Sequence, residues 1–297
     1  MGEDSNRVVA MATDERALLV AKEATCPFIG SAVAQDELPV RNDARNPLAS
    51  IEDVRRLGNT GGGDLGDLLV LFATGNHAFM QGESGKLDKK VPIGLFSLQF
   101  PGSQGSHSGH SGILEEDPYI PGSGRFGQSN FERLVSRAKD GWIKRSDVGR
   151  FIAENLRRDP NSKVFGNDTA LLLASDLRAF IEAVGPAWMS RLVGSNEEAG
   201  AAHRELEEKL TRVLGEDNLV GSAGEFGLLF AFLANKPDAR QIDGEAAVAV
   251  QDLTAMFVDK RLPEGWKSWR KLRLDWVKHT TGLLLSAARE YQTNAVR

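Results

Sequence analysis

Apolar residues recur along most of this chain at intervals of three and four positions, the spacing of amphipathic α-helices. No two segments of alternating polarity flank a convincing hairpin turn. We therefore predict an all-α fold. The predicted helices are Glu15 to Glu23, Phe28 to Ala34, Ser50 to Leu57, Asp64 to Met80, Phe131 to Ala138, Ser146 to Arg157, Thr169 to Leu192, Ala199 to Leu214, Gly224 to Leu233, Glu245 to Val258 and Trp266 to Tyr291.

One stretch, residues 82–128, breaks the helical pattern because it is rich in Gly, Ser and Pro. A loop of this length is uncommon inside a compact domain. Its scattered large apolar residues indicate an ordered loop that packs over the core. Since there is no internal repeat and no clear linker, we predict one globular domain over residues 1–297. We expect residues 1–13 to be flexible and residues 159–221 to be a helical insertion.

The composition, with 41% hydrophobic and 26% charged residues, is typical of a soluble globular protein. A formal charge of −5 and the lack of a basic block argue against nucleic acid as a partner. No segment reaches the roughly 18 apolar residues that a membrane span needs. No secretory signal is visible, so we expect a cytoplasmic or otherwise intracellular protein, or a secreted one if a precursor segment was removed. The oligomeric state stays open.

The single cysteine, Cys26, directly precedes Pro27. Proline favours the first position of a helix, so Cys26 is expected at the N-cap. Backbone N–H groups of Phe28 or Ile29 would then point at the sulfur, and together with the helix dipole they would lower the pKa of the thiol. A thiolate held in this way is a nucleophile or a metal ligand. The alternative is a buried, unreactive thiol.

The loop contains a cluster of potential metal ligands. The carboxylates of Glu115, Glu116 and Asp117 suit Mg²⁺ or Ca²⁺, and His107 and His110 could add nitrogen ligands for a transition metal. This pattern allows a non-heme metalloenzyme. It equally allows a solvated acidic turn beside polar loop histidines.

Glu225 stands at the head of the apolar run that begins with Phe226. Apolar surroundings raise the pKa of a carboxyl group, which would suit Glu225 to general acid/base catalysis. Ser222 and Glu225 also have the spacing of a capping box, in which Glu225 would only bond the backbone N–H of Ser222. The segment alone does not decide between these two roles.

In their order along the chain, these segments resemble the heme-thiolate chloroperoxidase and unspecific peroxygenase family. The resemblance covers most of Thr25 to Trp266 as short ordered motifs. They are Cys26-Pro27 with Leu38-Pro39-Val40-Arg41-Asn42, Glu115-Glu116-Asp117 beginning 89 positions after Cys26, Asn130-Phe131, Asp140-Gly141-Trp142-Ile143, the Arg-rich helix from Asp147 to Arg158, Glu225-Phe226, and Arg261-Leu262-Pro263-Glu264-Gly265-Trp266.

The resemblance implies an all-α fold that encloses heme b, with the Cys26 thiolate as ligand of the heme iron and Pro27, Phe28 and Phe226 beside the cofactor. It implies that Glu225 is the acid/base that moves protons of hydrogen peroxide. It also implies small apolar organic substrates, with halide as a further candidate. The resemblance further implies that Glu115 binds a structural Mg²⁺.

The chain departs from the family pattern at the expected partner of the catalytic acid. Glu116 occupies the position where short members of the family have a histidine, and Tyr119 replaces an expected serine. Either His110 or His77 could replace the missing partner. We therefore take Glu225, Glu116 and His110 as the candidate catalytic residues. The competing hypotheses are the non-heme metalloenzyme and a non-catalytic helical binding protein in which Cys26 is buried.

Overall fold

Helices form most of the part of the chain that a computed structural model describes, which comprises residues 26–43, 46–70, 95–97, 114–115, 125–158, 201 and 218–293. The α-helices are α2 (Pro27–Ala34), α3 (Ile51–Gly58), α5 (Gln128–Val135), α6 (Arg145–Arg158), α10 (Asn218–Leu233), α11 (Val250–Phe257) and α12 (Arg273–Thr293). Two 3-10 turns are η1 (Thr60–Gly62) and η3 (Trp266–Ser268). The predicted helices over 15–23, 169–192 and 199–214, most of 64–80, and most of the predicted insertion lie outside the described residues.

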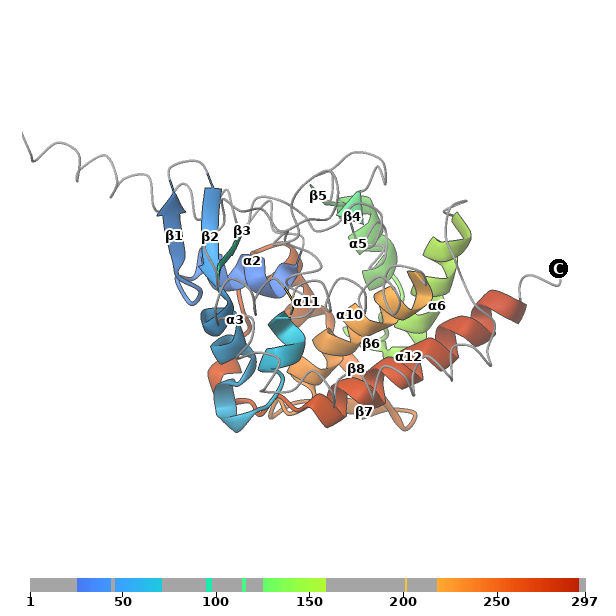
Figure 1. Ribbon diagram of the computed structural model, residues 1–297. Coiled ribbons are helices and arrows are strands. Elements are labelled where there is room, and N and C mark those ends of the chain that lie inside the picture. Colours follow the sequence, from blue (N-terminus) through green and yellow to red (C-terminus); the bar gives the residue numbers. More distant parts are fainter. Residues whose placement is uncertain are drawn as a thin grey trace, which may run out of the picture.

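The three longest described helices pack side by side, with α10 against both α12 and α6 (Figure 1). Helix α10 is apolar around most of its circumference, and Leu219, Ala223 and Phe230 on it are buried. Helix α12 is bonded to it directly, because the indole N–H of Trp276 donates to the carbonyl oxygen of Gly224 at 2.9 Å. An apolar helix must be covered on several sides, which explains its place in the core.

The predicted helical character is confirmed for the described residues, and short antiparallel sheets accompany the helices. The strands are β1 (Val40–Asp43), β2 (Asn46–Ser50), β3 (Leu95–Ser97), β4 (Leu114–Glu115), β5 (Arg125–Phe126), β6 (Trp142–Lys144), β7 (Arg240–Ile242) and β8 (Glu245–Ala249). They pair in the orders β1-β2-β3, β4-β5 and β6-β8-β7. The described part of the chain is therefore mainly helical rather than all-α.

Asp-Gly pairs explain the third sheet. Asp243 and Gly244 join β7 to β8 with φ values of 54° and 79°, the left-handed conformation that a two-residue type I′ hairpin turn requires. Asp140 and Gly141 form the same kind of turn before β6. The helical periodicity of Glu245 to Val258 obscured this signal, since its first five residues form β8.

Helix α2 is fixed against α11 and against the segment that follows it. Ser31 is fully buried, and its hydroxyl lies 2.7 Å from the carbonyl oxygen of Pro27 and 3.2 Å from that of Met256. The side-chain oxygen of Gln35 accepts a hydrogen bond from the backbone N–H of Leu262 at 2.8 Å. These contacts hold the first turn of α2 in place, and Cys26 with it.

A buried lysine stabilises the turn between η3 and α12. Lys271 is fully buried, and its Nζ donates to the carbonyl oxygens of Trp266 at 2.8 Å and Trp269 at 2.7 Å. The ammonium also lies 5.5 Å from the ring centroid of Phe232. Burial lowers the pKa of Lys271 to about 8. The carbonyl groups therefore orient this side chain without neutralising its charge.

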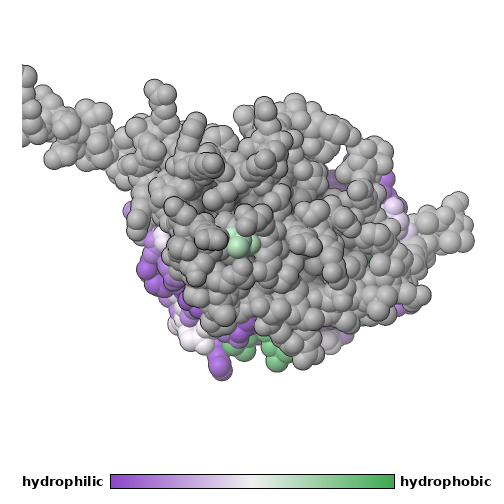
Figure 2. All heavy atoms as spheres, viewed as in Figure 1, coloured by the Kyte–Doolittle hydropathy of each residue, from purple (hydrophilic) through white to green (hydrophobic). Residues whose placement is uncertain are grey.

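Hydrophilic residues colour the lower left edge of the molecule in Figure 2, over α3, where Glu52 and Arg56 lie on the outer face. At the start of α12, Leu274 is 72% exposed, the largest value among the large hydrophobic residues that are described. Among the described helices, none has both the length and the apolar character needed to cross a bilayer.

Gly227→Ala is expected to lower the free energy of unfolding by about 1–3 kcal/mol. The reason is that a Cβ at this position of α10 would overlap the hydroxyl and the Cβ of Thr280 on α12. Urea unfolding followed by circular dichroism measures the change. Gly282→Ala is the matched control, because its Cβ would meet only the flexible end of Arg145. We expect that variant to be neutral or up to about 1 kcal/mol more stable; equal losses in both variants would contradict this packing.

Stability is expected to fall as the pH drops from 6.5 towards 4, because burial lowers the pKa of His279 from 6.5 to about 4. The unfolded chain binds a proton in this window and the folded chain does not, so acid favours unfolding by as much as about 3 kcal/mol. His279 stacks on Phe230, with ring centroids 5.4 Å apart. The variant His279→Phe should flatten this part of the pH profile in urea titrations, and an unchanged slope would contradict the assignment.

Candidate functional site

Cys26 occupies the N-cap of α2, as the sequence predicts. It has extended backbone angles (φ −78°, ψ 115°), and Pro27 forms the first helical residue. The backbone N–H groups of Ile29 and Phe28 lie close enough to the sulfur to favour the thiolate, although neither makes a hydrogen bond of ordinary geometry with it. The thiol is therefore placed where helix-end amides can stabilise negative charge.

The predicted lowering of the thiol pKa is wrong for the chain without a bound metal. Cys26 is half-buried against the hydrophobic core, and the loss of solvent around its sulfur raises the pKa of the thiol to about 11. Desolvation outweighs the helix-end amides because an ionised sulfur loses most of its hydration in apolar surroundings. Without a metal ion, the thiol is protonated at neutral pH.

Two side chains of opposite charge shift the pKa of the Cys26 thiol in opposite directions. Glu225 on α10 raises the pKa of the Cys26 thiol, and Lys260, three residues after the end of α11, lowers it. In return, Cys26 raises the pKa of Lys260, while burial, the larger effect, lowers it. The charges of a carboxylate and an ammonium from two other segments thus both act on the thiol at the start of α2.

Lys260 is the residue that sequence reasoning missed. Its Nζ lies 5.8 Å from the ring centroid of Phe126, and its backbone has a positive φ of 51°. The only signal in the sequence is its position directly before Arg261-Leu262-Pro263, one of the motifs that carry the family resemblance. The turn after α11 places Lys260 where its charge acts on the Cys26 thiol, and this turn could not be predicted from helical periodicity.

Glu225 lies inside a helix and not at its beginning. Helix α10 begins at Asn218, so Ser222 cannot be its N-cap. The capping box that the sequence allowed is therefore excluded. Glu225 is half-buried, four residues after the buried Gly221 and next to the buried Phe226.

The two aromatic residues expected beside a cofactor both pack into the core. Phe28 lies edge-on to Phe232, with ring centroids 4.7 Å apart, and 5.9 Å from Trp266. Phe226 is 3% exposed and lies edge-on to Phe151 at 6.3 Å. These rings support the first turn of α2 and the middle of α10. Their contact with a cofactor stays a prediction.

The remaining candidate residues come from the long loop, except His77, which precedes it. Glu116, His110, His107, Asp117 and His77 lie outside the described residues. The backbone of Glu115 belongs to β4, where it pairs with Arg125 of β5. Within the described ranges, no group of three or more His, Cys, Asp or Glu side chains is arranged to hold a metal ion.

Comparisons of the chain with models of protein families, with curated proteins and with solved structures find no match. The function is therefore inferred from the site itself and from the short sequence motifs between Thr25 and Trp266.

The donor set at Cys26 suits a heme iron. Thiolate sulfur is a known axial ligand of heme, and coordination removes the thiol proton because a metal ion replaces it. The N–H groups of Phe28 and Ile29 would stabilise the resulting negative charge. Binding of a metal ion by this sulfur would depend on pH, since the thiol proton must first be displaced.

Substitutions of the two charged neighbours should shift the pKa of Cys26 in opposite directions. Glu225→Gln removes a negative charge and should lower the thiol pKa, and Lys260→Met removes a positive charge and should raise it. In heme-free protein below pH 11, the rate of alkylation follows the thiolate fraction, so we expect it to rise roughly two- to tenfold in the first variant and to fall in the second.

Cys26 is the only cysteine, so Cys26→Ser provides the blank for this measurement. Changes of the same sign in both variants would show that these side chains do not act on Cys26 through their charge.

Proposed function

We propose that this chain is a heme-thiolate peroxidase or peroxygenase, in which Cys26 binds the iron of heme b and Glu225 moves the protons of hydrogen peroxide. One observation carries the proposal: α2 and α10 bring the Cys26 sulfur within electrostatic reach of Glu225, 199 positions later in the chain. A thiol at a helix N-terminus with a carboxylate nearby has the two groups that this chemistry needs.

Cys26 would hold the iron of heme b through its sulfur. When bound, heme supplies the redox chemistry that cleaves the O–O bond of a peroxide, and a thiolate ligand favours this cleavage by donating electron density. The protein holds the sulfur in position through the packing of α2 on α11, which Ser31 fixes by its contact with Met256. The backbone N–H groups of Phe28 and Ile29 would stabilise the negative charge of the thiolate.

Glu225 has the role of the acid/base. It would accept a proton from hydrogen peroxide bound at the site and donate it again as the O–O bond breaks. The assignment rests on its half-buried position inside the apolar helix α10. His110 and His77 are the candidates for the missing partner of Glu225, and Glu116, at the position where the family has a histidine, is a further candidate catalytic residue.

The substrates we propose are small apolar organic molecules, with halide as a further candidate. Leu228 and Leu229 follow Glu225 in the same helix and are half-buried, so an apolar surface continues from the carboxylate. Glu115 is the proposed ligand of a structural Mg²⁺. The non-heme metalloenzyme, which depends on His107 and His110, gains no support from the described residues.

A second candidate, the non-catalytic helical binding protein, is favoured by one observation. Burial raises the pKa of the Cys26 thiol to about 11, as expected for an inert thiol that packs as a small hydrophobic group. The two candidates differ in whether the folded protein takes up porphyrin.

The absorption spectrum of the purified protein tests the proposal. We expect a Soret band that shifts strongly to the red in the reduced complex with carbon monoxide, and a pyridine hemochrome that identifies heme b. In Cys26→Ser the red-shifted band should disappear while the helical content stays unchanged. A folded protein that stays colourless after incubation with hemin would overturn the proposal and support the binding protein.

Glu225→Gln should keep the heme and the red-shifted band but lose about 10²- to 10⁴-fold in peroxide-dependent turnover, because general acid/base catalysis contributes this much. Glu264→Gln is the matched control, since Glu264 is an exposed carboxylate in the turn before η3. Peroxide turnover that Glu225→Gln leaves unchanged would exclude Glu225 as the acid/base without excluding the heme.

A further inference from the structure

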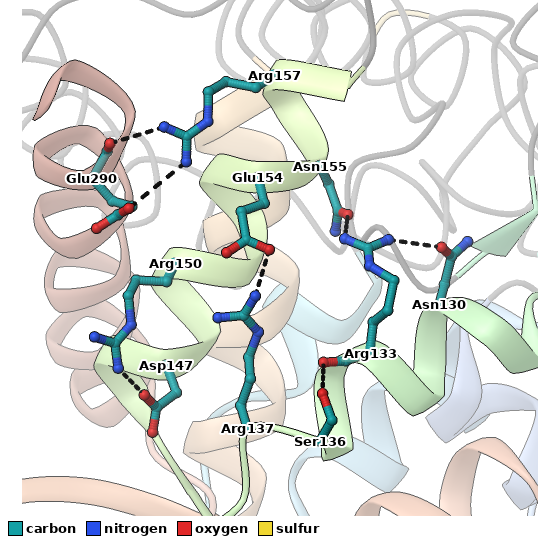
Figure 3. Close-up of polar contacts among 10 residues, drawn as sticks. All are labelled: Asn130, Arg133, Ser136, Arg137, Asp147, Arg150, Glu154, Asn155, Arg157 and Glu290. Carbon is teal, nitrogen blue, oxygen red and sulfur yellow. Dashed lines mark hydrogen bonds and ion pairs between the residues drawn. The ribbon is translucent and has the colours of Figure 1, made fainter. Parts of the chain in front are cut away.

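An arginine-rich pocket lies between α5 and α6, apart from the site at Cys26. Its volume is about 320 Å³, and its lining residues are Arg133, Glu154, Arg157 and Arg158. Figure 3 shows the guanidinium groups of Arg133 and Arg157 on either side of Glu154. Of the four lining side chains that belong to the described residues, three are thus positively charged.

Arg133 is held in a fixed orientation by neutral groups. Its two terminal nitrogens donate to the side-chain oxygens of Asn130 at 3.0 Å and Asn155 at 2.8 Å. Its guanidinium carbon lies 5.3 Å from the ring centroid of Phe151. None of these three contacts involves a carboxylate. These contacts therefore fix the orientation of the Arg133 guanidinium group without neutralising its positive charge.

The carboxylates around the pocket are already engaged. Glu154 accepts a hydrogen bond from Arg137. Arg157 donates to the carbonyl oxygen of Glu290 at 3.1 Å and lies 3.8 Å from its carboxylate. Arg158 is exposed at the rim. Among the described residues, the carboxylate of Glu154 pairs with Arg137 and that of Glu290 with Arg157. The positive charges of Arg133 and Arg158 are therefore in excess at the pocket.

Two buried donors beside the pocket have no acceptor within the described structure. They are Nε of Arg137 and the amide nitrogen of Asn155. Arg137 is bonded to Glu154 and Asn155 to Arg133, so both side chains belong to the network that builds the pocket wall (Figure 3). Burial and the nearby charge of Arg158 also lower the pKa of Arg133. An excess of oriented donors and positive charge is complementary to an anion with several oxygens.

We propose that this pocket binds an oxyanion, the phosphate or carboxylate group of a small anionic molecule, through the guanidinium groups of Arg133, Arg157 and Arg158. The planar fork of arginine pairs with two oxygens of such a group at once. The volume of about 320 Å³ exceeds what inorganic phosphate needs and leaves room for an organic part of the ligand. The site acts in binding or regulation and requires no heme.

Calorimetric titration of the full-length protein with inorganic phosphate, and separately with malonate, tests the proposal. Both titrations are made at constant ionic strength, with chloride as the competing ion. We expect saturable binding of at least one of the two probes. Arg158→Gln should weaken it about tenfold, the effect of losing one charge-assisted hydrogen bond. The stronger probe identifies which oxyanion the pocket prefers.

Arg150→Gln is the matched control, because Arg150 is an exposed arginine on the same helix that pairs with Asp147 and does not line the pocket. We expect it to bind the probes as the unaltered protein does. The absence of saturable binding, or equal weakening in both variants, would overturn the proposal. The readout is binding without turnover, so it is independent of whether the protein takes up heme.

Discussion

Helix α10 has almost no polar face, and this constraint shapes the rest of the described fold. An isolated helix of this kind would expose Phe226, Phe230 and Phe232 to water, so other elements must cover it. Helices α12 and α6 cover two of its sides, and the close approach of Gly227 to Thr280 allows α12 to lie tightly against it. Each of these buried aromatic side chains contributes about 2–3 kcal/mol to folding. The position of Glu225 follows from the same packing, since its helix has little freedom to rotate or shift.

The site at Cys26 shows two physical effects in competition. The start of α2 directs backbone N–H groups at the sulfur, which favours the thiolate, and the surrounding core removes water from it, which favours the thiol. Desolvation is the larger effect in the chain alone. A bound metal ion would reverse the balance, because its charge acts directly on the sulfur and is not screened by solvent in a buried site. The charges of Glu225 and Lys260 adjust this balance in opposite directions. A buried thiol with a raised pKa is therefore compatible with a metal ligand that forms only when the metal arrives.

The arginine pocket and the Cys26 site share parts of one framework. Phe151 of α6 contacts Phe226 of α10 on one side and the guanidinium group of Arg133 on another. The aromatic core thus orients a side chain at each of the two candidate sites. The chemistry of the two sites differs, because one offers a soft sulfur ligand in apolar surroundings and the other offers hard hydrogen-bond donors in excess. A chain with both could respond to two different ligands.

The sequence alone determined the mainly helical character, because a period of three to four residues requires only local geometry. It also placed Cys26 at the start of a helix, since the preference of Pro27 for the first turn is local as well. The hairpin after Asp243 was predictable in principle from its Asp-Gly pair, but the helical periodicity that follows concealed it. Only the tertiary structure decided that α10 begins before Ser222, that Lys260 approaches Cys26, and that burial raises the thiol pKa. These properties depend on which segments, distant in the sequence, pack together and exclude water, and no local sequence pattern specifies that packing.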